Sequence, residues 1–149
     1  MSPFRKKRIR VIGETERKLI ETLGSVANCR RYYGELGDME EPYLKDGELP
    51  LILVDFIGDM VDEGRELIFH IYFIHLTPSK SAREQKFKEA ISLIEAADKE
   101  IVNMRIEGTT RLKRLRKIFD AATKKGYLSV FTREVGITLY DYPYIGSTA

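Results

Sequence analysis

Two segments of the chain repeat apolar residues at helical spacing. In residues 12–26 the repeating positions are Ile12, Leu19, Ile20, Leu23 and Val26. In residues 82–103 the apolar side chains share one helical face, formed by Phe87, Ala90, Ile91, Ile94, Ala97 and Ile101. Ser81 and Glu84 have the spacing of a capping box, in which each side chain bonds a free backbone N–H at a helix start. The pattern therefore predicts two amphipathic helices.

Strand patterns occupy most of the remaining chain. Residues 28–33 favour extended backbone and predict a short strand. Residues 51–57 and 67–76 are almost continuously apolar, as buried strands are, and the polar residues 58–64 between them predict a turn. Residues 112–120 fit helical and strand spacing equally well. A turn at 124–126 and a strand at 127–140, with Phe131, Val135, Ile137 and Leu139 on one face, make a second hairpin the more economical interpretation.

This order of elements predicts an α+β fold. We expect a mixed, mainly antiparallel sheet of about four to five strands, with two helices packed on one face. Residues 12–141 form a single domain, which follows a basic N-terminal extension (1–11) and precedes an irregular tail (142–149). The long loop 34–50 is a candidate contact surface, because loops beyond about 12–15 residues are uncommon in compact domains and are often functional.

Charged residues are balanced in number but unevenly placed. The chain has 25 Lys and Arg against 23 Asp and Glu, a formal net charge of +2, whereas a general nucleic-acid-binding protein is usually more basic. Acidic residues gather in 35–48 and 55–66. Basic residues form two groups: Arg5, Lys6, Lys7, Arg8 and Arg10, and then Arg111, Lys113, Arg114, Arg116 and Lys117. Such segregation suits contacts between complementary protein surfaces.

Strand alternation would divide the second basic group between two faces. A regular strand places Arg111, Lys113 and Lys117 on one face, and Arg114 and Arg116 on the other. Each face would carry only a weak basic stripe, and no ladder of aromatic residues marks a platform for single-stranded nucleic acid beside it. The pattern favours protein contacts over nucleic acid.

Candidate reactive side chains do not assemble into a known constellation. His70 and His75 lie five positions apart in one predicted strand, so they point to opposite faces and cannot share a metal ion. The single cysteine, Cys29, excludes an intrachain disulfide, fits a reducing compartment, and more often is an inert small residue than a nucleophile. The carboxylates around residues 55–66 lack the lysine on the adjoining strand that a metal-dependent nuclease would use.

These observations predict no catalytic, cofactor-binding or metal-binding residue. The nucleotide-binding, hydrolase and paired-cysteine motifs are absent from the sequence. We therefore expect a protein that is not an enzyme and uses no cofactor. No apolar run approaches the roughly 20 residues that cross a bilayer, which predicts a cytoplasmic site of synthesis.

Two short motifs lie in the centre of the chain: Arg31-Tyr32-Tyr33-Gly34-Glu35-Leu36 and Leu49-Pro50-Leu51-Ile52-Leu53-Val54. They resemble the pattern Y-x-G-E-L, followed by L-P-x-hydrophobic-V, of a protein family found in Mu-like phages and prophages. The family's closing hairpin resembles Tyr127-Leu128-Ser129-Val130-Phe131 and the strand that continues to Tyr140. The resemblance spans roughly residues 13–140, and the basic N-terminal extension departs from it.

The resemblance implies a tail-terminator or tail-completion protein of a contractile tail. Such proteins form a ring, usually of six copies, at the head-proximal end of the tail. The ring ends growth of the tube or sheath and offers a docking surface to the neck. The implied partners are copies of the chain itself, the tail tube or sheath protein, and a neck or head-completion protein. DNA would at most pass through the ring. The implied location is the virion, after assembly in the host cytoplasm.

We expect the loops and the basic extension to make the contacts within such a particle. The extension would reach acidic groups on an adjacent subunit or sheath protein. The candidate contact residues are Arg5, Lys6, Lys7, Arg8, Arg10, Glu35, Asp38, Glu40, Glu41, Tyr43, Asp59, Asp62 and Glu63. Two alternatives stay open: a nucleic-acid-binding or metal-dependent nuclease domain, and an adaptor domain that remains monomeric.

Overall fold

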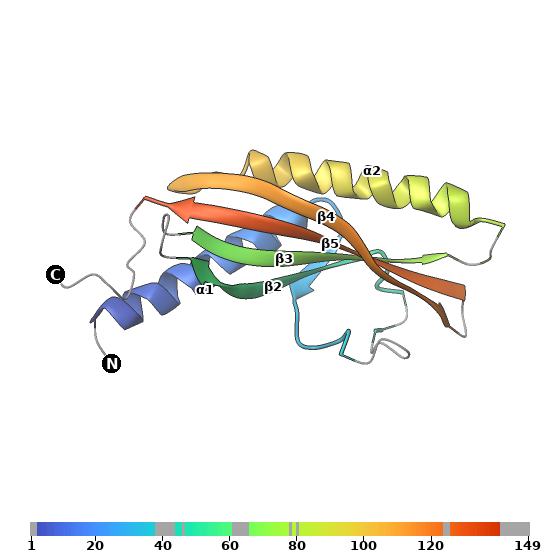
Figure 1. Cartoon of the computed structure of the whole chain (residues 1–149), viewed down its shortest axis with the longest axis horizontal. Coiled ribbons are helices and arrows are strands. Elements are labelled where there is room, and N and C mark those ends of the chain that lie inside the picture. Colours follow the sequence, from blue (N-terminus) through green and yellow to red (C-terminus); the bar gives the residue numbers. More distant parts are fainter. Residues whose placement is uncertain are drawn as a thin grey trace.

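Two helices and five strands make up the described part of the chain. The computed structural model describes residues 3–37, 44, 45, 47–60, 66–77, 79, 81–123 and 126–140. The elements, in chain order, are α1 (Pro3–Leu23), β1 (Asn28–Arg31), β2 (Leu51–Met60), β3 (Glu66–Thr77), α2 (Arg83–Val102), β4 (Gly108–Thr123) and β5 (Gly126–Leu139) (Figure 1).

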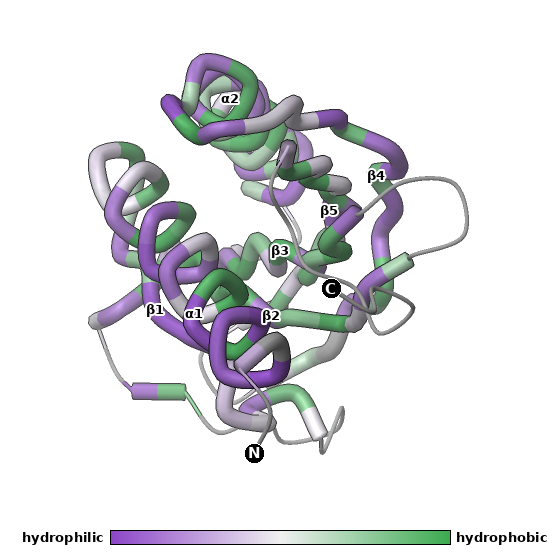
Figure 2. Tube along the Cα trace, turned by 90° about the vertical axis from the view of Figure 1, so that its left-hand side faces the viewer, coloured by the Kyte–Doolittle hydropathy of each residue, from purple (hydrophilic) through white to green (hydrophobic). Residues whose placement is uncertain are grey.

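The strands form one mixed sheet in the order β1-β2-β3-β5-β4. Only β1 runs parallel to its neighbour, β2, and the other neighbours are antiparallel hairpin or sheet partners. Both helices lie on the same face of this sheet, and Figure 2 shows them side by side. The predicted α+β fold is confirmed, as is the second hairpin, with residues 112–120 inside β4.

The main core lies between the helices and the sheet. Leu19 and Leu23 of α1 and Ile94 of α2 are at most 1% exposed, and they pack against Phe69 and Phe73 of β3. Burying a side chain of this size contributes about 1.5–3 kcal/mol. The helical spacing of apolar residues therefore corresponds to the faces that the helices bury.

A second, smaller core covers part of the opposite sheet face. Here Leu36, from the long loop, packs with Leu53 and Val130 of the sheet, and the partly buried Leu44 and Leu49 join it. Part of the loop that we expected to be a contact surface thus packs on its own domain. The remainder of this face, near the start of β3, carries polar side chains.

Helix α1 begins at Pro3, so the prediction of a helix that starts at residue 12, after a separate basic extension, was wrong. Proline is favoured at the first position of a helix, and Lys and Arg are good helix formers even without apolar periodicity. The first turns also bury little, and Ile9 is 54% exposed. The helical state of this segment therefore leaves almost no apolar signal.

Two further sequence predictions need correction. The predicted capping box does not form, because α2 has Ala82 at its N-cap without a side-chain hydrogen bond, and the Ser81 hydroxyl lies 3.0 Å from that of Ser79. The predicted turn at 58–64 begins too early, because β2 continues to Met60 through an irregularity between Phe56 and Gly58. The predicted tail, residues 142–149, lies outside the described residues. Neither described helix is long and apolar enough to span a membrane.

Candidate interaction surface

Strand β4 is a long edge of the sheet. It has 16 residues and, within the described part of the chain, is hydrogen-bonded to β5 alone, whereas the opposite edge strand, β1, has only four. The outer side of an edge strand presents backbone N–H and C=O groups that no neighbouring strand satisfies. A surface of this kind is a natural place for another chain to bind.

Two bulges in β4 change which of its side chains share a face. The register with β5 shifts between Leu112 and Arg114, and again between Lys117 and Phe119. Each extra residue reverses the alternation of the strand that follows it. The prediction that the basic residues divide evenly between two faces was therefore wrong.

Four basic residues lie on the face of β4 that points away from the helices. In the register with β5, Arg111 lies opposite Gly136, Arg114 opposite Glu134 and Arg116 opposite Thr132. These β5 residues have even numbers, whereas the β5 residues in the main core have odd numbers, so the three arginines point away from that core. Lys113, at the first bulge, reaches the same face, because its side chain contacts Glu66 on β3. We call Arg111, Lys113, Arg114 and Arg116 the basic row. Lys117 lies on the helix side.

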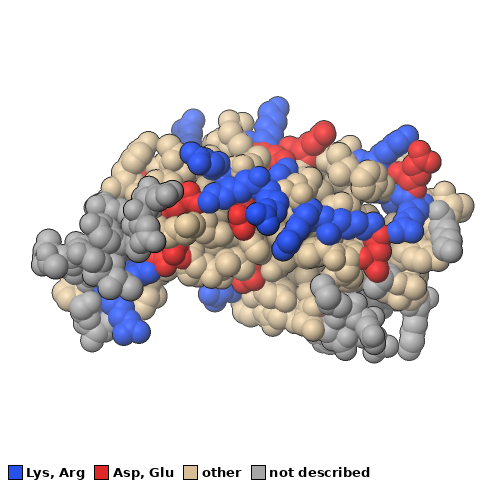
Figure 3. Space-filling view, viewed as in Figure 1, with Lys and Arg blue, Asp and Glu red and all other residues tan. Residues whose placement is uncertain are grey.

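The basic row is exposed and only partly neutralised. All its residues are exposed, and Figure 3 shows Lys and Arg side chains as a band along β4. Lys113 pairs with Glu66, whereas Glu134 contacts the ring of His70, with Nε2 and Oε1 3.1 Å apart. Within the described part of the chain, no ion pair involves the three arginines of the row. They leave a positive surface that an acidic partner could neutralise.

The sheet face beside the basic row carries polar side chains. The Tyr72 hydroxyl donates a hydrogen bond to Asp55 Oδ2 at 3.2 Å. Burial, followed by the Asp55 carboxylate, raises the pKa of Tyr72, so this phenol stays protonated as a donor. Burial also raises the pKa of Asp55. Between Tyr72 and Arg116 lies Thr132, whose buried hydroxyl has no hydrogen-bond partner among the described residues.

The predicted N-terminal contact residues lie on the first turns of α1. Arg8 forms an ion pair with Asp59 at the end of β2, so two residues predicted to face other subunits contact each other. Lys6 and Arg10 are exposed there, and Arg5 and Lys7 take part in contacts of their own. Helix α1 is thereby tied to the sheet.

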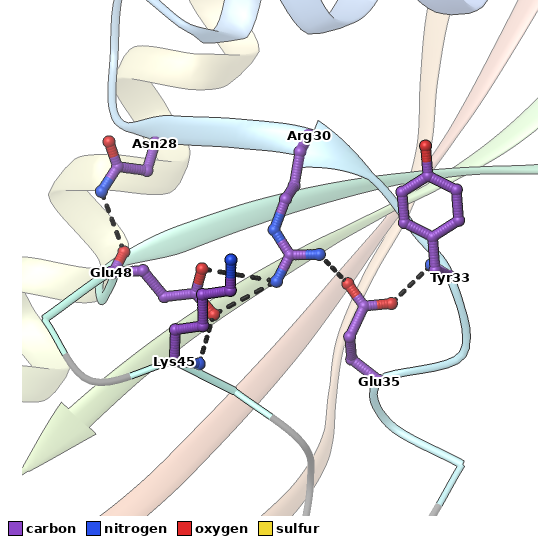
Figure 4. A network of polar contacts seen from close by, with 6 residues as sticks. All are labelled: Asn28, Arg30, Tyr33, Glu35, Lys45 and Glu48. Atoms are coloured by element: carbon purple, nitrogen blue, oxygen red, sulfur yellow. Dashed lines mark hydrogen bonds and ion pairs between the residues drawn. The ribbon is translucent and has the colours of Figure 1, made fainter.

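Glu35 is an internal anchor. Its carboxylate, 6% exposed, accepts hydrogen bonds from the Arg30 guanidinium of β1 and from the Tyr33 backbone N–H (Figure 4). Arg30 also donates to Glu48 Oε1 at 3.1 Å, and the Lys45 backbone N–H donates to the same oxygen at 2.7 Å. The network joins both ends of the long loop to β1. The structure thus gives Glu35 an intrachain role that its position in an acidic loop did not predict.

The remaining predicted contact residues, Asp38, Glu40, Glu41, Tyr43, Asp62 and Glu63, lie outside the described residues.

The candidate reactive residues are dispersed over the sheet. His70 and His75 point to opposite faces, as predicted: His70 contacts Glu134, and His75 stacks on Phe131 at a centroid distance of 5.9 Å. Burial raises the pKa of the Cys29 thiol to about 12, so it is almost entirely protonated at neutral pH. Within the described ranges, no three His, Cys, Asp or Glu side chains are placed to hold a metal ion.

Asp55 and Glu66, two of the carboxylates considered for a nuclease, do not converge. Asp55 is opposite His70, which follows Glu66 by four positions on β3. At about 3.4 Å per residue, Asp55 and Glu66 lie roughly 14 Å apart along the sheet. Lys113 does reach Glu66, from β4, but the two carboxylates cannot bind one metal ion together.

No protein-family model matches the chain, and a search of curated proteins finds no match.

Proposed function

We propose that the chain is a structural subunit of a contractile phage tail or a phage-derived tail-like particle. In this proposal, copies form a terminator ring that caps growth of the tube or sheath and provides the docking surface for the neck. The observation that carries the proposal is the basic row along the long edge of β4. It is a broad surface suited to holding another protein and contains no reactive cluster. The virion would be the site of action, after assembly in the host cytoplasm.

The residues that carry the family resemblance have clear intrachain roles. Gly34 has a φ of 89°, a left-handed conformation that other residues rarely adopt. Glu35 anchors Arg30, and Leu36 is buried in the second core. The Y-x-G-E-L pattern is therefore what this loop needs in order to fold onto the sheet. That supports a shared fold with the tail-terminator family more directly than it supports a shared contact.

A closed ring needs two unlike surfaces that meet head to tail. The basic row supplies one of them. The described acidic residues at the loops are neutralised inside the chain, because Glu48 pairs with Arg30, Asp59 with Arg8 and Glu66 with Lys113. The second surface would therefore consist of other acidic residues, on the next subunit or on the tube or sheath protein.

The decisive experiment compares two variants with the same change in net charge. In the test variant, Arg111, Arg114 and Arg116 are changed to Glu. In the control, the exposed Lys18, Lys88 and Lys99, all on the helices, are changed to Glu. Mass is measured across micromolar concentrations, and rings are sought by electron microscopy, with and without tails that lack this subunit. Adding tails matters because a terminator can stay monomeric until the end of a tail is offered.

We expect the wild-type chain and the control to form rings or to cap tails, and the test variant to do neither. A wild-type chain that stays monomeric and leaves tails uncapped would contradict the proposal and favour the adaptor domain. If the test variant capped tails as well as the wild type does, the basic row would not be the contact surface.

The basic row also favours a second candidate, binding to nucleic acid. Its residues could contact phosphates, and four such contacts would make the logarithm of the affinity fall with the logarithm of salt concentration at a slope of about −3 to −4. Retention of duplex DNA by the wild-type chain at physiological salt, lost in the test variant and kept in the control, would favour this function. Weak binding that disappears at physiological salt would not.

A further inference from the structure

A pocket of about 410 Å³ lies between the start of α2 and the sheet. It is at the end of the molecule where β3 ends and α2 begins (Figure 1). Its walls include His75 and Thr77 of β3, Arg83 and Phe87 of α2, and Lys117 of β4. Ser129 of β5 and Glu84 complete the lining. Sites for small ligands usually measure roughly 300–1,000 Å³.

Two residues of this pocket, His75 and Thr77, are largely buried but turn polar side chains to the pocket. His75 is 9% exposed and Thr77 is 1% exposed. Neither side chain makes a hydrogen bond to the described part of the chain, although both line the pocket. Among the described residues only Thr132 Oγ1 is both fully buried and unpaired, so the polar atoms of His75 and Thr77 are accessible from the pocket. The Thr77 hydroxyl is therefore available to a bound molecule.

The His75 ring is held in a fixed orientation. It stacks on Phe131 at 5.9 Å with an interplanar angle of 13°, and Phe87 lies against the same Phe131 ring at 6.0 Å. Burial lowers the pKa of His75, so the ring is neutral at pH 7, with one nitrogen able to donate and the other to accept. Phe87 is 47% exposed and forms an apolar wall at the mouth.

Two positively charged side chains also line the pocket. Arg83 and Lys117 both contact the Asp120 carboxylate, which also accepts a hydrogen bond from Ser129. Burial alone would raise the pKa of Asp120, but the hydrogen bonds from Lys117, Ser129 and Arg83 lower it overall. Asp120 therefore stays ionised, and one carboxylate is shared by two cations. Glu84 adds a negative charge at the rim.

The start of α2 adds further donors. Among the described residues no side chain caps this helix, so within that part of the chain the N–H groups of its first turn have no side-chain acceptor. The partial positive charge of a helix N-terminus attracts anions. An anion placed here would meet the helix end, Lys117 and the Thr77 hydroxyl together.

We propose that this pocket binds a carboxylate attached to an aromatic or aliphatic group. The carboxylate would accept hydrogen bonds from Thr77 and the first turn of α2 beside Arg83 and Lys117, and the apolar group would lie against Phe87. Such a group could be the C-terminal residue of a partner protein or a free carboxylic acid. The inference rests on the pocket alone and is independent of the ring proposal.

The test uses the full-length chain and three small probes. N-acetyl-phenylalanine imitates a C-terminal residue, N-acetyl-phenylalaninamide lacks the carboxylate, and phenylacetate is a free acid. Binding is followed by the NMR shifts of the His75 ring and of backbone amides. A good ligand of this size reaches a Kd on the order of 1 mM or lower. We expect N-acetyl-phenylalanine to saturate in this range and the amide to bind at least tenfold more weakly.

Variants separate this pocket from other binding sites. Thr77→Val keeps the shape and removes the hydroxyl, and Lys117→Gln removes one cation. Each should weaken binding about five- to tenfold, the effect of one hydrogen bond. Lys88→Gln, an exposed residue of α2 outside the pocket, serves as the control and should bind as the wild type does. Urea midpoints show whether each variant is folded.

The outcomes distinguish the source of the carboxylate and the validity of the site. Tighter binding of N-acetyl-phenylalanine than of phenylacetate supports a protein C-terminus, and the reverse order supports a free acid. Absence of saturation with both acids overturns the proposal. Equal binding of the amide overturns the role of the carboxylate, and an unchanged affinity in both variants overturns the location.

Discussion

Replacing Glu35 with Ala should destabilise the fold, although Glu35 lies in a loop. The substitution removes the acceptor for the Arg30 guanidinium and for the Tyr33 N–H. Hydrogen bonds to charged groups contribute about 1.5–3 kcal/mol each when both partners are buried. Arg30 is 34% exposed and still pairs with Glu48 after the substitution, so the loss of its bond to Glu35 costs less than this range. We expect a total cost of about 2–3 kcal/mol for Glu35→Ala and about 1 kcal/mol for Glu35→Gln.

The matched control is Glu21→Ala. Glu21 forms an ion pair with Arg17 at 3.2 Å, but the two side chains are 57% and 70% exposed. Exposed pairs of this kind contribute at most about 0.5 kcal/mol. The free energy of unfolding is measured by urea titration followed by circular dichroism, and values are compared only where the slopes agree.

A cost for Glu35→Ala no greater than that for Glu21→Ala would refute the reasoning. If Glu35→Ala instead left stability unchanged but abolished assembly, Glu35 would be a partner contact, as the sequence first suggested, and the network in Figure 4 would carry little energy.

Three further changes test the packing and the titrating groups. Gly108→Ala should destabilise the fold by about 1–3 kcal/mol, because an added Cβ would lie 2.1 Å from the Thr138 backbone oxygen. Gly13→Ala, which has open space around it in α1, should stabilise the fold by about 0.5–1 kcal/mol. Thermal unfolding measures both effects, and equal effects of the two substitutions would contradict the prediction. Cys29 should react slowly with iodoacetamide in the folded chain at pH 8 and fast in urea, because burial raises the pKa of its thiol to about 12. Equal reaction rates in the folded and the unfolded chain would contradict this protection of the thiol. Burial lowers the pKa of His75 from its ordinary 6.5, so the unfolded chain binds the His75 proton more readily than the folded chain does. The stability that comes from burying the neutral ring is therefore complete above pH 6.5, and it falls as the pH drops towards the pKa of the folded state. Urea titrations between about pH 7.5 and 5.5 should show that fall, and His75→Gln should flatten it while the neighbouring Asp120, Lys117, Lys86 and Glu89 remain.

The apolar pattern of the sequence was enough to predict the layers of the fold. Ala90, Ile94, Ala97 and Ile101 mark the buried face of α2, and all four are buried there. The strands of both hairpins follow from continuous or alternating apolar residues. The start of α1 could not be predicted in this way, because its first turns bury few side chains and its helical state depends on propensity and on contacts such as that between Arg8 and Asp59.

The candidate sites were less accessible to sequence reasoning. The basic row depends on the bulge at Lys113, and nothing in this run of basic and apolar residues marks the position of a bulge. The pocket draws on four separate elements, so that His75 and Thr77 meet Lys117 only after folding. Glu35 could be recognised as part of a motif, but not as the partner of Arg30.

The long edge of β4 has a consequence for self-association. Two copies aligned edge to edge would bring their basic rows together, and like charges directly opposite one another oppose pairing. The arginines therefore keep the strand from templating sheet-like aggregates of this chain, while leaving it accessible to an acidic strand. Since salt weakens repulsion between exposed charges, concentrated solutions of the isolated chain should be most stable against aggregation at low ionic strength.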